Sequence, residues 1–576
     1  MPRPAPRAVT PEHKSLVELE LGFSRYLASF DSRRLPAYRF DVVVLGSGVA
    51  GSCAAMAAAR AGCSVALVAK DELSHTNTQY AKGGVAAVLA PEDSFEEHVA
   101  DTLRVGCGLC DAATVEAVVR GGPEAIERMV GWGAKFDCDP AGRLELSREG
   151  GHSRPRIVHA QGASTGLELQ RTLADVVGRH PSIATFPRTF ALDLVQDETG
   201  LRTLLCRTDR DEPVLFVAEQ FVLATGGAGQ LYRETTNPEI ATGDGLAMGL
   251  RAGAALADLE FVQFHPTCLY IAGAARVLVS EIVRGAGGVL VDRNGAPFMA
   301  AFHPSADLAP RDVVSRACFR RMVETGDTSV YLDLSHLARD PHELFPALSR
   351  TCRTFHIDIA RDPIPVRPGA HYWIGGLRVD LDGRTSVPRL WAAGECACSG
   401  LHGANRMGSN SLLEGLVLGT RAGSCAARAA LEEPSRERTG KPLHERPAGP
   451  AEVALGIEDM TYSLKSLMWR QMGIEREASA LQDALEKIRF WTHAVQALAP
   501  PEPRAWELVN MLTLARLATE CALVRDESRG THHRVDHPGT KDAWRAHTLV
   551  TPRLEGAVVA GVTIAREPVA QHQPVG

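Results

Sequence analysis

The chain has 576 residues, of which 45% are hydrophobic and 23% charged, and its formal net charge is −7. This length predicts two to four domains with separate cores. The acidic balance argues against a protein that binds nucleic acid. The sequence contains neither an uninterrupted run of 18 apolar residues nor the apolar centre of a signal peptide. We therefore expect a cytoplasmic protein that does not bind a membrane.

Thirteen cysteines are spread thinly along the chain. An odd number in so long a sequence is untypical of a disulfide framework. Cys107 and Cys110 form a C-x-x-C, and Cys396 and Cys398 form a C-x-C, but neither has the second pair and nearby histidines of a zinc site. We expect no metal and interpret the thiols as structural or incidental, with a metal or redox role as the alternative.

The first 37 residues read as a loosely held extension with one amphipathic stretch. From Phe40 the pattern changes to "FDVVVLGSGVAGSCAAMAAARAGCSVALVAK". This pattern predicts a buried strand, a glycine turn, an alanine-rich helix and a second apolar strand. Strand and helix signals continue to alternate as far as residues 221–229, where another strand ends in glycines.

The middle of the chain shows a different sequence pattern. Residues 260–372 mix helices and short strands with Gly and Pro breaks, and the segment that begins "LWAAGECACSG" then restores strand, glycine loop and long helix. A linker rich in proline and charge follows, and helical patterns lie at 453–464, 477–496 and 503–527. This order predicts a nucleotide-binding domain that is interrupted by an inserted cap and followed by a helical bundle.

The glycines Gly46, Gly48 and Gly51 lie between a predicted strand and a predicted helix, where a dinucleotide fingerprint belongs. Gly46 would permit the tight turn, Gly48 would let the backbone approach a pyrophosphate, and Gly51 would let the helix pack closely on the strand. A purely structural glycine turn is the alternative. The second strand ends at Lys70 and not at an acid, which departs from the simple NAD pattern.

Several stretches, in this order, resemble the succinate dehydrogenase/fumarate reductase flavoprotein superfamily. They are "NTQYAKGGVAAVL" (77–89), "ATGG" (224–227), "TGDGLAMGLRAGA" (242–254), "FVQFHPT" (261–267), "SEIVRGAGG" (280–288), "LAPRDVVSRA" (308–317), "HYWIGGL" (371–377), "AAGE" (392–395) and "GLHGANRMGSNSLLE" (400–414). The resemblance covers residues 38 to about 535.

Two further stretches are similar to the L-aspartate oxidase family within that superfamily. They are "SFEEHVADTLRVGCGLCD" (94–111) and "LSREGGHSRPRIVHAQGASTG" (146–166). Respiratory relatives attach flavin to a histidine six residues before the Gly-Gly pair. Here that position is Asn77, and His75 lies two residues too early, so we expect FAD that is bound without a covalent link.

The resemblance implies an α/β fold with a Rossmann-type FAD-binding domain, an α+β capping domain within it and a C-terminal helical bundle. The expected boundaries are an N-terminal extension (1–37), the two parts of the FAD-binding domain (38–258 and 373–430), the capping domain (259–372), a linker (431–452), the helical domain (453–540) and a C-terminal tail (541–576).

The resemblance also implies which residues bind FAD. Asp244 belongs to "TGDG", Glu395 would hold ribose hydroxyls, and Ser411 with Leu412 would begin a helix whose N-terminus favours negative charge on the flavin. The expected set is Gly46, Ser47, Gly48, Val49, Ala50, Gly51, Lys70, Asn77, Thr78, Gln79, Tyr80, Ala81, Lys82, Gly83, Gly84, Asp244, Glu395, Ser411 and Leu412.

A dicarboxylate substrate needs two anion pockets. We expect Arg406 to grip one carboxylate with its planar guanidinium. His265 and His371 would donate hydrogen bonds, and Ser280 would help with the second carboxylate. A lone histidine is more often an ordinary core residue, but both histidines lie in motifs of the family.

Glu281 and Arg284 are three residues apart on a predicted helix and therefore share a face. In the superfamily such a chain relays protons, and here Arg311 would be its terminal donor and acceptor. An arginine holds its proton to about pH 12, so donation to fumarate is easier to explain than acceptance. A structural ion-pair cluster is the alternative interpretation.

Glu149 precedes Gly150 and Gly151 among Arg148, Arg154 and Arg156 in the sequence. A carboxylate there would make a charge-assisted hydrogen bond to the ammonium of aspartate, whereas succinate offers no such partner. We expect the arginines to keep Glu149 ionised and the glycines to let the loop close. A solvated salt bridge is the alternative.

The expected reaction is hydride transfer from C2 of L-aspartate to FAD, which gives iminoaspartate, with reoxidation by O2 or fumarate. The resemblance places it as the first step of de novo NAD biosynthesis, with quinolinate synthase receiving the product. Two alternatives stay open: a soluble fumarate reductase or succinate dehydrogenase flavoprotein subunit, and a flavin-binding subunit without turnover.

Overall fold

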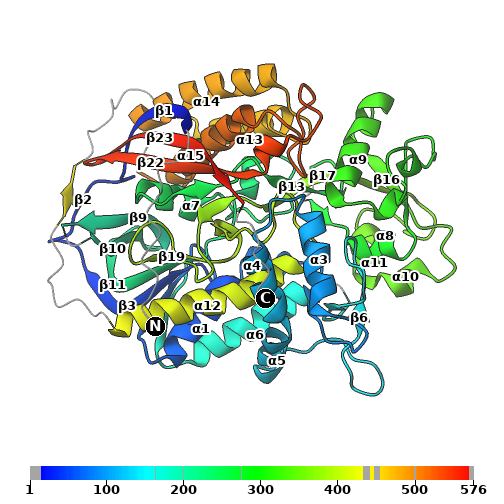
Figure 1. The fold of residues 1–576 in the computed structure, drawn as a ribbon, viewed down its shortest axis with the longest axis horizontal. Coiled ribbons are helices and arrows are strands. Elements are labelled where there is room, and N and C mark those ends of the chain that lie inside the picture. The colour runs from blue at the N-terminus through cyan, green and yellow to red at the C-terminus, as the bar shows by residue number, and fades with distance from the viewer. Residues whose placement is uncertain are drawn as a thin grey trace.

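In the computed structural model the described residues are 15–162, 164–198, 200–273, 276–432, 442–445, 455–498 and 501–569. They form a mixed α/β molecule in which a central sheet carries helices, a second sheet lies to one side and a helical region lies above (Figure 1). All thirteen cysteines are free thiols. Within the described ranges, none of the helices combines the length and the apolar character needed to cross a membrane.

The central sheet has seven strands. Its parallel part consists of β8 (Ile183–Phe186), β4 (Val65–Val68), β3 (Ala37–Leu45), β11 (Pro213–Leu223) and β19 (Leu390–Ala392). The antiparallel hairpin of β10 (Gly200–Arg207) and β9 (Phe190–Asp197) extends it beyond β11. The apolar runs of β3 and β4 are buried because helices cover both faces of a parallel sheet.

Two helices that cover this sheet pack directly against each other at very short range. They are α1 (Val49–Arg60) and α12 (Asn410–Glu432). A Cβ atom at Gly419 would lie 2.5 Å from the Ala50 carbonyl oxygen, and one at Gly423 would lie 2.5 Å from the Ala54 Cα. Only glycine fits this contact, which fixes the N-terminal ends of the two helices relative to each other.

The second sheet is antiparallel and lies at the right of Figure 1. Its strands are β14 (Val277–Leu278), β13 (Val262–Leu269), β17 (Ile364–Trp373), β16 (Val330–Asp333) and β15 (Val289–Val291). Four helices belong to the same unit: α8 (Glu281–Gly285), α9 (Arg311–Thr325), α10 (Pro341–Leu344) and α11 (Pro346–Arg353). This unit has a hydrophobic core of its own, which includes Leu290, Val314 and Leu332.

Three long helices follow, as the helical patterns near the C-terminus predict. They are α13 (Ile457–Gln471), α14 (Ala478–Leu498) and α15 (Pro503–Val524). From Ala505 to Ala522 every residue of α15 except Glu507 and Arg516 is buried, which is typical of a helix that is surrounded by other elements. Its packing joins the helical region to the core of the central sheet.

The described residues near both ends of the chain form strands, which the sequence pattern does not predict. Strand β1 (Ser15–Ser24) pairs with β23 (Val558–Pro568), which forms a hairpin with β22 (Ala546–Glu555). The amphipathic stretch of the predicted extension is therefore a strand, and much of the predicted C-terminal tail is sheet. Apolar residues at every second position of β1 pack on the core. Most of the predicted linker 431–452 lies outside the described residues.

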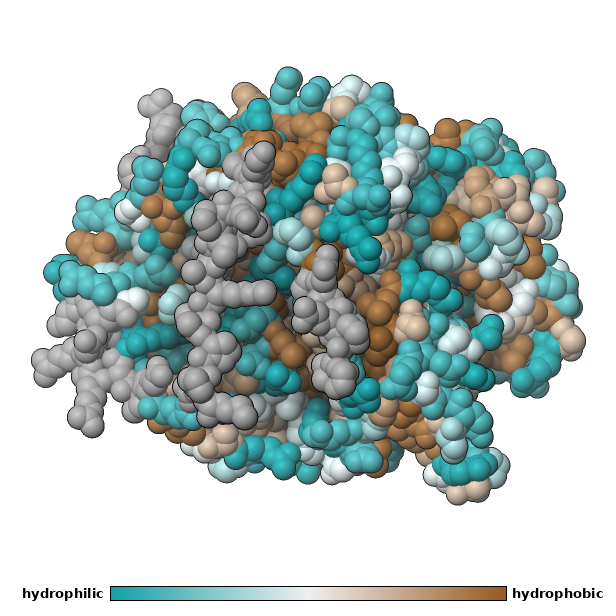
Figure 2. Space-filling model, in the orientation of Figure 1, coloured by the Kyte–Doolittle hydropathy of each residue, from teal (hydrophilic) through white to brown (hydrophobic). Residues whose placement is uncertain are grey.

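Exposed apolar side chains are scattered over the surface. Phe490 on α14 and Val323 on α9 are 72% and 68% exposed and come from different units. On the face drawn in Figure 2, hydrophobic patches are separated by hydrophilic areas. Single exposed apolar side chains are normal for a globular protein.

Replacing Gly423 by Ala should destabilise the protein, because the new methyl group would overlap the α1 backbone. Overpacking of this kind costs about 1–3 kcal/mol. Gly178 of α6 (Thr165–Arg179) is the matched control, since a Cβ there meets no atom within 4 Å. Denaturant unfolding should show a lower midpoint for G423A and an equal or higher one for G178A. Equal midpoints for G423A and the wild type would refute the close contact.

Candidate functional site

The glycine turn lies between β3 and α1, in the predicted context. Gly46 has φ +102°, a conformation that favours glycine, and a Cβ there would overlap the Ala224 carbonyl. A Cβ at Gly51 would overlap the Gly46 carbonyl, so Gly51 is required by the close approach of helix and turn. The N-terminus of α1 is thereby directed toward the open space above the sheet, where it can bind an anion.

A cleft of about 860 Å³ begins at the carboxyl ends of β3, β4 and β11, the usual place for a ligand in such a sheet. Most of the predicted FAD residues line it. These are Gly46, Ser47, Gly48, Val49, Ala50, Lys70, Asn77, Thr78, Tyr80, Ala81, Lys82, Asp244, Glu395, Ser411 and Leu412. Gly83 and Gly84 line a smaller neighbouring cavity, whereas Gly51 and Gln79 line neither.

The cleft fits FAD in size and in chemistry. Its volume lies within the range of cofactor pockets. Within the described chain, the Asn77 Oδ1 atom is buried without a hydrogen-bond partner, although the Asn77 amide nitrogen donates to Glu395 at 3.2 Å. Burial raises the pKa of Glu395 to about 7. An amide and a carboxyl group of this kind, side by side in the cleft, suit the hydroxyl groups of a ribose or ribityl chain.

Lys70 takes part in a network that the sequence did not reveal. Its Nζ lies 2.8 Å from Asp244 Oδ2 and 2.5 Å from Glu507 Oε1, and Asn510 donates to the other Asp244 oxygen at 2.7 Å. Burial would lower the pKa of Lys70, but the two carboxylates raise it. Glu507 and Asn510 belong to α15, so the C-terminal helix supports this side of the cleft. No local sequence signal links them to Lys70.

A second cavity, of about 40 Å³, adjoins the cleft and shares Lys82, His371 and Arg406 with it. It unites predicted substrate and relay residues from distant parts of the chain: Glu149, His265, Ser280, Glu281, Arg311, His371 and Arg406. The relay residue Arg284 does not line it.

Two guanidinium groups that line this cavity converge on Gln263, which lies behind them and does not line it. Arg311 Nη1 and Arg406 Nη1 each donate to Gln263 Oε1 at 3.2 Å, and Arg406 Nη2 donates to Ser411 Oγ at 2.7 Å. The Arg406 Nε is buried and has no acceptor in the described ranges. Burial and the charge of Arg311 lower the pKa of Arg406 to about 10. A bound carboxylate would satisfy this donor and relieve the repulsion.

Gln263 was missed in the sequence analysis, although a signal existed. It precedes His265 by two positions on β13, and alternate residues of a strand lie on the same face. A glutamine two positions before His265 therefore shares the face of a candidate ligand, and this spacing is the signal that points to it.

The two histidines lie together, with ring centroids 5.3 Å apart. Burial, and then neighbouring arginines, lower the pKa of both His265 and His371 well below the usual value, so both are neutral. The Nδ1 of His265 accepts from the Thr267 amide at 3.3 Å, so its Nε2 carries the proton and can donate.

The predicted relay residues form a chain leading away from the cavity. Arg311, the first residue of α9, donates through Nε to Glu281 Oε2 at 2.8 Å, and Arg284 Nη2 lies 3.8 Å from the other Glu281 oxygen. Burial would raise the pKa of Glu281, but Arg311 and Arg284 lower it, so Glu281 is ionised. A Cβ at Gly150 would overlap this carboxylate, which explains a glycine that we had interpreted as a hinge.

Glu149 is buried and accepts a hydrogen bond from Ser409 Oγ at 2.7 Å. The expectation is wrong for two of the three arginines, because Arg154 pairs with Glu97 at 3.0 Å and Arg156 pairs with Asp93 and Asp101 at 2.7 Å.

Residues far away in the sequence supply the charge near Glu149. Glu149 and Arg311 both reach Gly408, where a Cβ would lie 2.8 Å from Glu149 Oε2 and 3.0 Å from Arg311 Nη2. Neighbours in sequence could not indicate this arrangement.

Known proteins with similar sequences show the family of this chain. The family model described as FAD binding domain matches residues 41–412, and the one described as fumarate reductase flavoprotein C-term matches residues 461–574. The chain is 42% identical to L-aspartate oxidase of Streptomyces coelicolor over 530 residues, which is 88% of this chain and 91% of that protein. It is 45% identical to L-aspartate oxidase of Mycobacterium tuberculosis over 511 residues, covering 88% and 94%.

Solved structures give the same superfamily. A chain of Escherichia coli quinol fumarate reductase is 30% identical with a TM-score of 0.84, and the match covers 94% of this chain and 99% of that one. Mycobacterium smegmatis Sdh1 is 33% identical with a TM-score of 0.82, covering 94% and 96%. The predicted fold class and FAD as the cofactor are confirmed, and the chain belongs to the L-aspartate oxidase family of FAD-binding flavoproteins.

Proposed function

We propose that this protein oxidises L-aspartate to iminoaspartate with FAD as the electron acceptor. The observation that carries the proposal is the position of Glu149, a buried carboxylate in the same cavity as Arg311 and Arg406. Two guanidinium groups attract a dicarboxylate, and the added carboxylate selects one that bears an ammonium group. When bound, FAD supplies the chemistry of hydride acceptance.

Different side chains bind different groups of the substrate. Arg406 binds one carboxylate through its unpaired Nε, and His371 lies beside it as a further donor. His265 and Ser280 serve the second carboxylate. Glu149 accepts from the ammonium group and so fixes which face of C2 is presented. During oxidation, C2 loses hydrogen with its electron pair and the nitrogen loses a proton, which leaves a C=N bond.

The chain of Arg311, Glu281 and Arg284 acts in the reverse type of reaction, the reduction of fumarate. When fumarate is reduced, one carbon receives a hydride and the other a proton, and Arg311 is the donor that reaches the cavity. Glu281, which is ionised and contacts Arg311 at 2.8 Å, passes to Arg311 a proton that it takes up from the side of Arg284, the outer member of the chain. The ion-pair geometry keeps Arg311 aimed at the substrate in either direction.

Further parts of the proposal concern the attachment of FAD, the final electron acceptor, the location of the protein and the fate of the product. We propose FAD without a covalent link, O2 or fumarate as the final acceptor, a cytoplasmic address and transfer of the unstable product to quinolinate synthase as the first step of de novo NAD biosynthesis. A respiratory flavoprotein subunit is less well supported, because nothing in its dicarboxylate substrate would pair with Glu149. A subunit without turnover would not need the assembled relay.

The direct test uses the purified protein with bound FAD. L-aspartate, D-aspartate and succinate are supplied separately while peroxide is measured. We expect turnover of L-aspartate only. Turnover of succinate without L-aspartate would overturn the assignment.

Replacing Glu149 by Gln should reduce L-aspartate oxidation far more than fumarate reduction. A hydrogen bond to a charged group contributes about 1.5–3 kcal/mol, which corresponds to roughly a 10- to 150-fold loss in kcat/KM. E97Q is the control. It breaks the exposed ion pair between Glu97 and Arg154, and Arg154 lies in the same loop as Glu149. Equal losses in both reactions would remove the selective role of Glu149.

Replacing Gly150 by Ala should impair the relay, because the new methyl group would displace the Glu281 carboxylate. A misplacement of about 1 Å can cost about 100-fold in rate, and we expect the loss mainly in kcat of fumarate reduction. Gly285 of α8 is the matched control, since a Cβ there meets no atom within 4 Å. Wild-type kcat in G150A would show that Glu281 is not held by this contact.

A further inference from the structure

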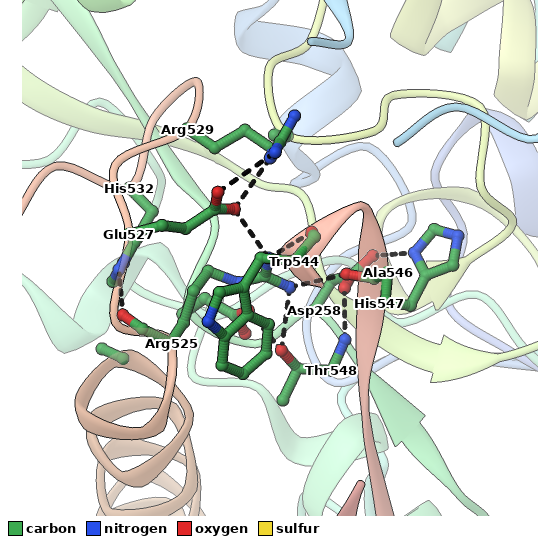
Figure 3. Close-up of polar contacts among 12 residues, drawn as sticks. Asp258, Arg525, Glu527, Arg529, His532, Trp544, Ala546, His547 and Thr548 are labelled. Carbon is green, nitrogen blue, oxygen red and sulfur yellow. Dashed lines mark hydrogen bonds and ion pairs between the residues drawn. The ribbon is translucent and has the colours of Figure 1, made fainter. Parts of the chain in front are cut away.

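The end of α15 leads into a buried polar cluster centred on Arg525, which is drawn in Figure 3. All five N–H groups of its guanidinium have acceptors. Nε donates to Glu260 at 2.6 Å, and the two terminal nitrogens donate to Glu527 Oε1, the Trp544 and Ala546 carbonyls and Thr548 Oγ1, at 2.9 to 3.1 Å. Arg525, Glu260 and Glu527 are fully buried. Such a saturated group holds its surroundings in a single arrangement.

The cluster is in contact with the strand that carries the substrate residues. Glu260 and Phe261 directly precede β13, which bears Gln263 and His265. The Arg525 guanidinium lies over the Phe261 ring at 4.9 Å and over the Trp544 ring at 4.6 Å. Both the charge of Glu260 and the ring of Phe261 are therefore fixed by the C-terminal domain.

Phe261 also connects the cluster with Arg406. It shares a small hydrophobic cluster with Tyr372 and Ala404. The Arg406 guanidinium lies over the Tyr372 ring at 4.6 Å. The ring that supports Arg406 thus belongs to the same hydrophobic cluster as the ring that Arg525 covers.

A second connection runs through the backbone. Thr531, six residues after Arg525, donates to the Ala404 carbonyl twice, through its amide at 3.0 Å and through Oγ1 at 3.2 Å. The Ala404 amide in turn donates to the Gly106 carbonyl at 3.0 Å. A Cβ at Gly530 would overlap the Ala404 carbonyl, so the two loops are in close contact. Ala404 lies two residues before Arg406.

We propose that Arg525 and Thr531 of the C-terminal domain are positioning residues for Arg406, so that this domain completes the dicarboxylate site without touching the substrate. The inference rests on the proposed binding of a carboxylate by Arg406. Its consequence is specific: loosening Arg406 weakens carboxylate binding in the ground state and the transition state alike, which raises KM and leaves kcat unchanged.

The test compares three variants of the FAD-bound enzyme. T531V removes the hydroxyl that holds Ala404, T531S keeps it, and T519V removes a buried hydroxyl of α15 whose acceptor is the Ala515 carbonyl of the same helix. We expect KM for L-aspartate and for fumarate to rise 3- to 10-fold in T531V, with kcat within twofold of the wild type. T531S and T519V should keep KM within about 1.5-fold.

The dissociation constant of malonate, a dicarboxylate that does not react, is measured in parallel from the change in the visible spectrum of the bound FAD. It should rise in T531V by the same factor as KM. Should T531V not fold, T531A removes the same hydroxyl and carries the same expectation.

Equal KM values in T531V and T519V, or equal impairment in T531S and T531V, would overturn the inference. Failure of the proposed function is recognised separately, as a wild-type enzyme that does not oxidise L-aspartate. The positioning role is then still measured with malonate.

Discussion

The site depends on one electrostatic constraint: Arg311 and Arg406 are held close together in a buried cavity, with a single neutral oxygen of Gln263 between them. Like charges at low dielectric repel strongly, so the arrangement requires nearby anions. Glu281 provides one and Glu149 another. A substrate carboxylate bound by the two guanidinium groups would screen their repulsion, and part of the binding energy therefore comes from relieving a repulsion that the fold maintains.

Charge counting explains why one substrate suits this cavity better than its relatives. With Arg284 included, three guanidinium groups face two carboxylates, and one positive charge remains. L-aspartate carries a net charge of −1 and would neutralise the cluster, whereas succinate would leave an excess negative charge next to Glu149. Selectivity thus follows from the total charge as well as from a single hydrogen bond, and both depend on the exclusion of water.

Sequence patterns predicted the parts of this protein that arise from local periodicity. The strand, glycine turn and helix around Gly46 follow directly from apolar runs and from residues that permit positive φ. Motif resemblance identified Arg311 and Arg406. Contacts between distant segments were not predictable: Glu507 reaches Lys70 from the C-terminal domain, and Arg154 and Arg156 pair with acids other than Glu149. The packing of the folded chain determines which side chains pair, and a single sequence does not show that packing.

The C-terminal domain therefore has a role beyond covering the central sheet. It supports the cofactor cleft through the Glu507–Lys70 ion pair and the substrate side through Arg525 and Thr531, so residues of one region stand behind both sites. Because α15 carries Glu507 near its start and ends directly before Arg525, one continuous helix joins the residues that support the two sites. A single helix thus makes the geometry of carboxylate binding dependent on the same packing that supports the cofactor.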